Sequence, residues 1–373
     1  MDRHLWRSTG TALAIATVSA LPLGALHAKP PPASPPQFEV VMIETPLGQP
    51  LEAFDINNRQ EVVGNFSDPA THTSRGFFWT ETQGLLDLGV ALEGGRSAAQ
   101  GINECGEIAG WTEVPGQQRL SPARWHRGSS DLEIIADVNG AAAGINERGH
   151  IVGNFLNAAN QFHAFLWTPE DGIIDLGTLG SGDDASFAYD VNNKDEVVGT
   201  SFTTGGQHAF LWTRRHGMRD LGALDNETSE AHGINDSHQV TGFTHIPIQV
   251  GSRPFLWTSK QGMVALEVPD LGPPDHLGDG HGFDNNQRGQ ITGDASFPDF
   301  GHRAAIWMAG SAAPVQIDFD PQPALTSLGN AINDRGDVVG RQEGTGFERA
   351  VVWRVVGGSQ KPKPNDDKLC RKR

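Results

Sequence analysis

The chain has 373 residues, with 45 acidic and 28 basic side chains, a formal net charge of −17 and 46 glycines. An acidic surface repels polyphosphate, so the charge argues against a nucleic-acid partner. Two cysteines are too few for a disulfide framework, and abundant glycine with few helix signals predicts an all-β protein built from tight turns.

Residues 1–28 are predicted to be a secretory signal peptide. Arg3 and Arg7 precede the apolar stretch "TALAIATVSALPLGALHA", which is rich in small residues and ends at Ala28. An uncleaved anchor is the alternative, although the stretch is short for a membrane span. Residues 29–37, "KPPPASPPQ", read as an extended Pro-rich spacer. We expect a secreted protein, extracellular or periplasmic, with no membrane span after signal cleavage.

Two markers recur seven times in register along the rest of the chain. The first is a tryptophan, at Trp79, Trp125, Trp167, Trp212, Trp257, Trp307 and Trp353. The second is an asparagine that lies 20–22 residues earlier and has a glycine seven residues after it, at Asn57, Asn103, Asn146, Asn192, Asn235, Asn286 and Asn333. A repeat of about 45 residues that reads as four short strands is the period of a β-propeller blade. The prediction is one seven-bladed β-propeller domain over 38–356, made of four-stranded antiparallel blades.

Each asparagine is predicted to open a tight hairpin turn such as Asn146-Glu147-Arg148-Gly149. Asparagine can bond the backbone ahead of it, and glycine accepts the left-handed φ that the loop needs. Three units carry Gln60, Asp195 or His238 in place of that glycine, where a side chain implies strain.

The two ends of the repeat region predict how the ring closes. The seventh unit stops after its third strand, "RAVVWRVV" at 349–356, while "FEVVMIETPLG" at 38–48 precedes the first unit. We expect this N-terminal strand to complete the last blade, because closure pairs edges that would otherwise be exposed.

The repeated residues are predicted to be structural. The tryptophans should pack between adjacent blades. A polar residue stands four positions before each one, at Arg75, Ser121, His163, His208, Arg253, Arg303 and Arg349. We expect these to bond neighbouring groups such as Asp87, Asp175 and Asp220 of the "DLG" segments, with a ligand-facing ring of donors as the alternative.

The segment "HAFLWTPEDGIIDLGTLGSGDDASFAYDVNNKDEVVGTSFTTGGQHAFLW" at 163–212 resembles the HAF repeat of bacterial probable extracellular repeat proteins. The resemblance covers about 51–356 and weakens around 265–330, where Ala265-Leu266-Glu267 replaces "DLG". It implies a secreted or cell-surface protein. The family has no established catalytic residues or cofactor, so the resemblance implies no reaction.

No catalytic signature is present: the sequence lacks Gly-x-Ser-x-Gly, His-Glu-x-x-His, Cys-x-x-Cys and phosphate-loop motifs. Blade-specific loops are therefore the predicted place for a ligand, because propellers assemble sites from loops of different blades. The candidate ligand-binding residues are Asp183, Asp184, Glu230, His232, Asp275, His276, Asp279, His281 and Trp111, the last in the expected loop "WTEVPGQQRL".

A metal site is a weaker hypothesis. Asp275, Asp279 and Asp284 supply hard oxygen ligands of the kind Ca²⁺ prefers, and the nearby histidines suit a transition metal. The alternative is that these acidic, Gly-rich loops are solvated turns that bind no metal.

Three functions follow from this pattern. The favoured one is a non-catalytic, monomeric binding module for an extracellular glycan, peptide or surface component. The second is a hydrolase or lyase, with or without Ca²⁺, which requires the loop carboxylates and histidines to converge at the channel mouth. The third is a structural envelope or matrix protein. The tail at 357–373, which contains Cys370, is predicted to be disordered, and its pairing with Cys105 is left open.

Overall fold

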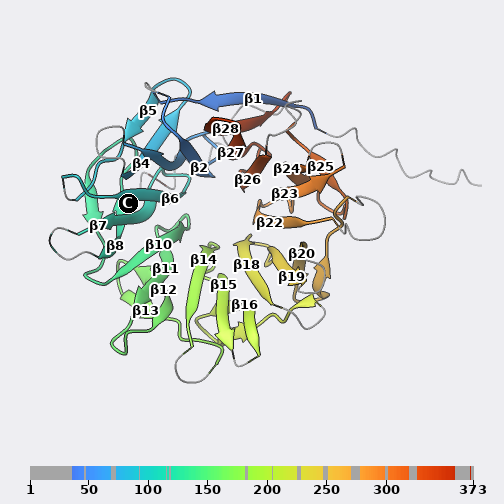
Figure 1. Cartoon of the computed structure of the whole chain (residues 1–373). Coiled ribbons are helices and arrows are strands. Elements are labelled where there is room, and N and C mark those ends of the chain that lie inside the picture. The colour runs from blue at the N-terminus through green and yellow to red at the C-terminus, as the bar shows by residue number, and fades with distance from the viewer. Residues whose placement is uncertain are drawn as a thin grey trace, which may run out of the picture. The chain divides into compact units, whose positions relative to one another are not determined.

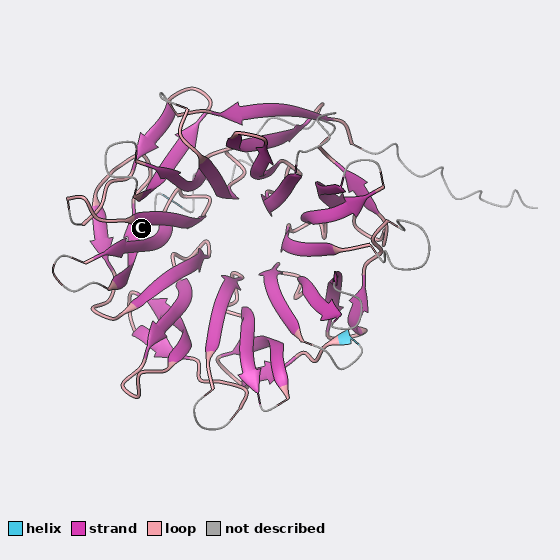
Figure 2. Cartoon of the chain, in the orientation of Figure 1, coloured by secondary structure: helices cyan, strands magenta, loops and turns pink. Residues whose placement is uncertain are grey.

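The computed structural model describes residues 36–45, 48–68, 73–91, 93–114, 116, 119–180, 184–203, 205–224, 228–246, 251–269, 278–298, 301–318, 326–357 and 370. Within residues 36–373, seven four-stranded antiparallel sheets surround one axis, as Figure 1 shows. Figure 2 shows strand and connecting loop almost throughout the described part. The predicted seven-bladed β-propeller is confirmed.

In blades 1 to 6 the first strand in sequence is innermost and the fourth is outermost, whereas in blade 7 β26 is innermost and β1 is outermost. Blades 1 to 4 comprise β2 (Leu51–Ile56), β3 (Val62–Ser67), β4 (Ser74–Thr80) and β5 (Gly84–Asp87); β6 (Ser97–Ile102), β7 (Ile108–Glu113), β8 (Leu120–Trp125) and β9 (Leu132–Ile134); β10 (Gly140–Ile145), β11 (Ile151–Leu156), β12 (Phe162–Thr168) and β13 (Gly172–Asp175); and β14 (Ser186–Val191), β15 (Val197–Thr203), β16 (Gly206–Thr213) and β17 (Gly217–Asp220).

Blades 5 to 7 follow the same order. They comprise β18 (Ser229–Ile234), β19 (Val240–Ile246), β20 (Gly251–Thr258) and β21 (Gly262–Ala265); β22 (Gly280–Asn285), β23 (Ile291–Phe297), β24 (Gly301–Trp307) and β25 (Pro314–Gln316); and β26 (Thr326–Ile332), β27 (Val338–Gly344) and β28 (Phe347–Val355), joined by β1 (Phe38–Ile43).

The N-terminal strand closes the ring as predicted. β1 pairs antiparallel with β28 in the register Phe38↔Val355 to Ile43↔Ala350, and it forms the outer strand of blade 7. Ile43 is fully buried in the core cluster between blades 7 and 1. The pairing therefore gives blade 7 its fourth strand and leaves the outer edge of β28 covered.

The strained turns are also confirmed. Gln60, Asp195 and His238 have φ of 60°, 58° and 61°, the left-handed region that favours glycine. Each of these side chains reaches the preceding blade, where Gln60 binds Asp337 at 2.9 Å and His238 binds Glu196 at 2.6 Å. The contacts between blades offset the cost of a side chain at this position.

The seven marker tryptophans lie at the seven blade interfaces. Trp125 of blade 2, for example, is fully buried in one cluster with Val63 and Phe78 of blade 1, and Trp353 of blade 7 packs with Ile306 of blade 6. Their expected role as the packing unit between blades is confirmed.

Three of the polar residues that precede the tryptophans form ion pairs within their own blades. Arg75 pairs with Asp87 at 2.8 Å, His163 with Asp175 at 2.8 Å, and His208 with Asp220 at 2.9 Å. These ion pairs join the third strand to the last residue of the fourth, which is the structural role expected for them.

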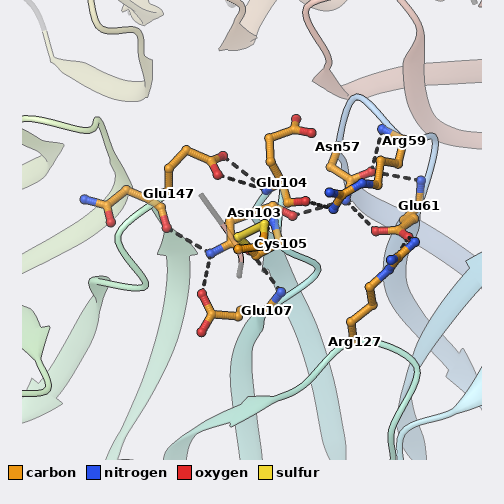
Figure 3. Close-up of a disulfide and its surroundings, with 11 residues drawn as sticks. Asn57, Arg59, Glu61, Asn103, Glu104, Cys105, Glu107, Arg127 and Glu147 are labelled. Carbon is orange, nitrogen blue, oxygen red and sulfur yellow. Dashed lines mark hydrogen bonds and ion pairs between the residues drawn. A yellow bond between two sulfur atoms is a disulfide. The ribbon is translucent and has the colours of Figure 1, made fainter. Parts of the chain in front are cut away.

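A disulfide joins Cys105 to Cys370, with the two Cα atoms 5.3 Å apart (Figure 3). It ties the chain beyond blade 7 to the turn between β6 and β7 in blade 2. The predicted signal peptide lies outside the described residues, as do most of the predicted spacer and tail. No helix in the described residues is long and apolar enough to cross a membrane.

Candidate ligand-binding channel

The inner strands of the seven blades surround the propeller axis (Figure 1), and two cavities along this axis form what we call the channel. A cavity of about 330 Å³ lies at the end formed by the asparagine turns. A second cavity, of about 120 Å³, is lined by the inner strands themselves. Asp55, Asp190 and Asp284 contribute to both cavities, so these three carboxyl groups mark the boundary between the two ends of the channel.

The turn end is closed by a continuous ring of side-chain hydrogen bonds. Each marker asparagine donates its Nδ2–H to the carbonyl of the asparagine in the next blade, at 2.9–3.2 Å. Asn57 binds Asn103 in this way (Figure 3), and Asn333 returns to Asn57. The Oδ1 atom of each asparagine accepts two backbone N–H groups of its own turn, as Asn103 does from Cys105 and Glu107. These residues are buried, so every polar group needs its partner.

A second ring runs beside the first. The residue after each asparagine donates its backbone N–H to the side chain of the equivalent residue in the next blade, as Glu104 does to Glu147 and Asp334 to Asn58. The same step occurs between Asn58 and Glu104 at 2.8 Å. The same hydrogen bonds thus repeat in all seven blades at the turn end, so the place of a residue within the turn determines which bond it makes.

The three channel aspartates connect adjacent blades. Asp55 accepts the backbone N–H of Ile56 in its own blade and that of Ile102 in the next, both at 2.7 Å. Asp190 and Asp284 do the same in blades 4 and 6. Burial raises the pKa of Asp55 to about 7 and that of Asp190 to about 6, and it raises the pKa of Asp284 well above its usual range. The other two aspartates raise the pKa of Asp284 further. This part of the channel therefore retains protons near neutral pH.

A β-bulge in every inner strand explains how side chains reach the channel. The register shifts at the third residue before each marker asparagine, for example between Ala188 and Asp190. Strict alternation would send consecutive side chains to opposite faces, whereas the bulge lets Tyr189 and Asp190 line the same cavity.

The bulged residues differ between blades. In blades 4 to 6 they are Tyr189, His232 and Phe283, which form a group of rings with Phe243 of β19. Tyr189 stacks on His232 with centroids 4.5 Å apart and planes 6° from parallel. His232 stacks on Phe243 at 5.2 Å, and Phe283 lies edge-on to His232 at 5.9 Å. We call Tyr189, His232, Phe243 and Phe283 the aromatic wall.

Two carboxylates hold the histidines around this wall. Glu230 binds His232 at 3.3 Å and lies 3.6 Å from His245. These histidines oppose the effect of burial and lower the pKa of Glu230.

The second carboxylate, Asp294, is almost completely buried and binds two histidines. Its Oδ1 is 3.0 Å from His281 and its Oδ2 is 2.7 Å from His302, both through Nδ1. Hydrogen bonds and charge from Asp294 raise the pKa of both histidines, and the histidines lower the pKa of Asp294 against the effect of burial.

The structure brings part of the predicted site together. Glu230 and His232 contact each other beside the channel. His281 contacts Asp294 and the ring of Phe283, and Asp279 lies 3.5 Å from His302. These predicted residues thus gather at blades 5 and 6, and His232 among them lines the second cavity.

Other predicted site residues lie elsewhere or outside the description. Asp183, Asp275 and His276 lie outside the described residues. Asp184 lies just before β14, where its buried Oδ2 has no partner among the described residues. Trp111 is part of β7, opposite Ala98 and Pro122, and not in the loop predicted for it.

The described residues do not assemble the candidate metal ligands. Asp279 accepts the backbone N–H of Ser252, whereas both oxygens of Asp284 accept N–H groups inside the channel. No group of three or more histidine, cysteine, aspartate or glutamate side chains in the described part could hold a metal ion.

The sequence-based search found Glu230, His232 and His281 but missed other residues of the site that lie on strands. Tyr189, Phe243, Phe283, Asp294 and His302 are all in strands, whereas the search addressed loops. A signal was present: two positions before the marker asparagine, three repeats carry aspartate and the other four carry glycine or alanine. Aligning the repeats on that position would have identified the channel aspartates.

Known proteins share the fold but little sequence. No family model matches the chain, and no curated protein is detectably similar to it. The β-propeller domain of the Trilobed protease from Pyrococcus furiosus, described as having an open velcro topology, is similar with a TM-score of 0.58 and 9% identity over 82% of this chain and 95% of that one. A catalytically inactive virginiamycin B lyase from Staphylococcus aureus, solved with quinupristin, gives 0.54 and 10% over 86% and 100%. TolB from Acinetobacter baumannii gives 0.45 and 9% over 83% of this chain and 65% of TolB. Identities this low establish a β-propeller and nothing about activity.

Proposed function

We propose that the protein is an extracellular or periplasmic binding module whose ligand is a carbohydrate that enters the channel opposite the asparagine turns. The observation that carries this proposal is the aromatic wall. Flat rings beside a polar channel suit a sugar, whose ring has apolar faces and a rim of hydroxyl groups. The disulfide supports export, because such bonds persist in oxidising compartments.

The polar groups around the cavity fit the same ligand. Gln100 and Asn330 line it together with His232, and the channel aspartates, whose pKa values burial raises, lie at its inner boundary. Amides, imidazole and carboxyl groups offer both donors and acceptors to hydroxyl groups. A peptide ligand is the alternative, and the experiment below separates the two.

The experiment compares two histidine variants of the full chain by calorimetry against a panel of neutral and acidic oligosaccharides and a panel of peptides. His232→Ala removes a ring at the centre of the stack, so the Kd of the best saccharide should rise at least about tenfold. His216→Ala changes an exposed histidine in the turn before β17 and should leave the Kd unchanged. Binding of peptides but no saccharide, or equal affinity of both variants, would refute the proposal.

A further inference from the structure

The hairpin of β23 and β24 in blade 6 carries a chain of three hydrogen-bonding side chains. Ser296 and His302 are cross-strand partners, and the Oγ of Ser296 lies 3.1 Å from Nε2 of His302. The Nδ1 of the same ring lies 2.7 Å from Asp294 Oδ2. Because Asp294 and Ser296 are two residues apart on one strand, their side chains share a face.

Blade 5 provides an internal comparison. There the same two cross-strand positions hold His245 and Ser252 with the residue types exchanged, and Phe243 stands where blade 6 has Asp294. Ser252 Oγ lies 3.3 Å from Nδ1 of His245, and the carboxylate of Glu230 is 3.6 Å from its Nε2. Only blade 6 of this pair therefore has a serine at Nε2 and a close, buried carboxylate at Nδ1.

We propose that Ser296, His302 and Asp294 form a nucleophilic triad that hydrolyses carboxylic esters. Ser296 Oγ bonds to the acyl carbon as its proton passes to Nε2 of His302. The bond from that carbon to the alcohol oxygen then breaks, and Nε2 returns the proton to the alcohol. Water adds to the acyl carbon and gives a proton to Nε2, and the bond to Oγ breaks as the proton returns to Ser296. Asp294 is the positioning residue that fixes the ring through Nδ1.

The surroundings set the pH at which the triad works. The carboxylates of Asp294 and of Asp279, which lies 3.5 Å from Nε2, both raise the pKa of His302. His281 is bound to the other oxygen of Asp294. His302 must lose its proton before it accepts one from Ser296, so the rate should rise with pH and have its midpoint above 6.5.

A substrate reaches Ser296 from the side on which His302 is exposed to solvent. Ser296 is 6% exposed, whereas the side chain of His302 is 37% exposed, so an acyl group approaches from the solvent side of the imidazole. A small probe with an accessible electrophile is therefore the suitable reagent.

The test treats the full chain with a fluorophosphonate probe, locates the adduct by mass spectrometry, and follows hydrolysis of p-nitrophenyl acetate. The expected result is one adduct on Ser296, lost in Ser296→Ala. His302→Gln should slow both reactions at least about 100-fold. Ser252→Ala, which changes the serine of the corresponding His–Ser pair in blade 5, should react like the unaltered protein. Asp294→Asn should lower the rate and shift its pH midpoint downward, because it removes the charge that raises the pKa of His302.

An adduct elsewhere or none at all would overturn the proposal, provided that treatment with the probe leaves the thermal unfolding midpoint of the protein unchanged. So would equal rates in His302→Gln, which would show that the serine has no assisting base. If Ser296→Ala does not fold, the adduct site and the His302→Gln rate still decide the question. The probe reaches Ser296 without a ligand in the channel, so failure here leaves the proposed carbohydrate binding untouched.

Discussion

The two ends of the axial channel use the same seven inner strands in different ways. At the turn end, the same asparagine makes the same bonds in every blade and the ring closes on itself. At the other end, the bulged residue changes from blade to blade, and the stacked rings lie in blades 4 to 6. The hydrogen bonds that repeat in every blade hold the propeller together. The positions at which the blades differ mark the place where a ligand would be recognised.

The largest expected effect comes from breaking the turn end. Asn235 is fully buried, donates to Asn286 and Gln239, and accepts two N–H groups of its own turn. Asn235→Ala should therefore lower the free energy of unfolding by about 3–5 kcal/mol, because several buried groups lose partners. His232→Ala, on the strand β18 that leads into this turn, should lower it by only about 1 kcal/mol. Urea unfolding of both variants checks the contrast, and equal losses would show that the two ends do not differ in this way.

Opening the disulfide should have the next largest effect. Cys105 lies in one of the asparagine turns, and its bond to Cys370 closes a segment with a sequence separation of 265. Cys105→Ser should lower the free energy of unfolding by about 2–4 kcal/mol, through the entropy regained by the unfolded chain. Cys370→Ser breaks the same bond and must give the same loss within error. A different loss in Cys370→Ser would mean that Cys105 acts through its turn and not through the bond.

A smaller effect is expected from the pH dependence of stability. It reports on the channel aspartates, which lie at the boundary between the two ends of the channel. The pKa values of Asp55 and Asp190 are raised in the fold, so the folded state holds protons that the unfolded state releases above about pH 4. Stability should fall as the pH rises from about 4 to 7, and further as His281 and His302 lose their protons above 6.5. Thermal unfolding midpoints between pH 4 and 8 should decrease by several degrees.

Asp190→Asn separates the contribution of the channel aspartates to this pH dependence from that of the two histidines. It removes one buried titrating group, so the fall between about pH 4 and 6 should become shallower while the fall above 6.5 remains. The exposed Asp131→Asn is the control and should leave the profile unchanged. A midpoint that rises with pH in the unaltered protein would contradict the raised aspartate pKa values.

The sequence predicted the features that recur. Trp353 and Asn333 could be assigned because each has six counterparts in register, and a residue with counterparts has its environment defined by them. Gln60 could be recognised as strained because it replaces a glycine of known conformation. The closing strand β1 followed from counting strands in the last unit.

The site could be predicted only in part, because it depends on contacts between blades. Glu230 and His232 were found, yet Asp294 and His302 were hidden in strands that look like ordinary sheet. Which strand residues face the channel is decided by the bulge, and a two-residue alternation read from sequence gives the wrong face for Tyr189. The family resemblance stays a prediction, because no family model matches the chain.

The pairing of β1 with β28 has a consequence for folding. Glu39 and Arg354, which form an ion pair across this seam, are 315 residues apart in the sequence. Synthesis delivers one partner long before the other, so an emerging chain must carry an incomplete ring with an open strand edge. Folding is therefore expected to finish slowly and only after the last strand is released, and any factor that shields β1 until then would raise the yield.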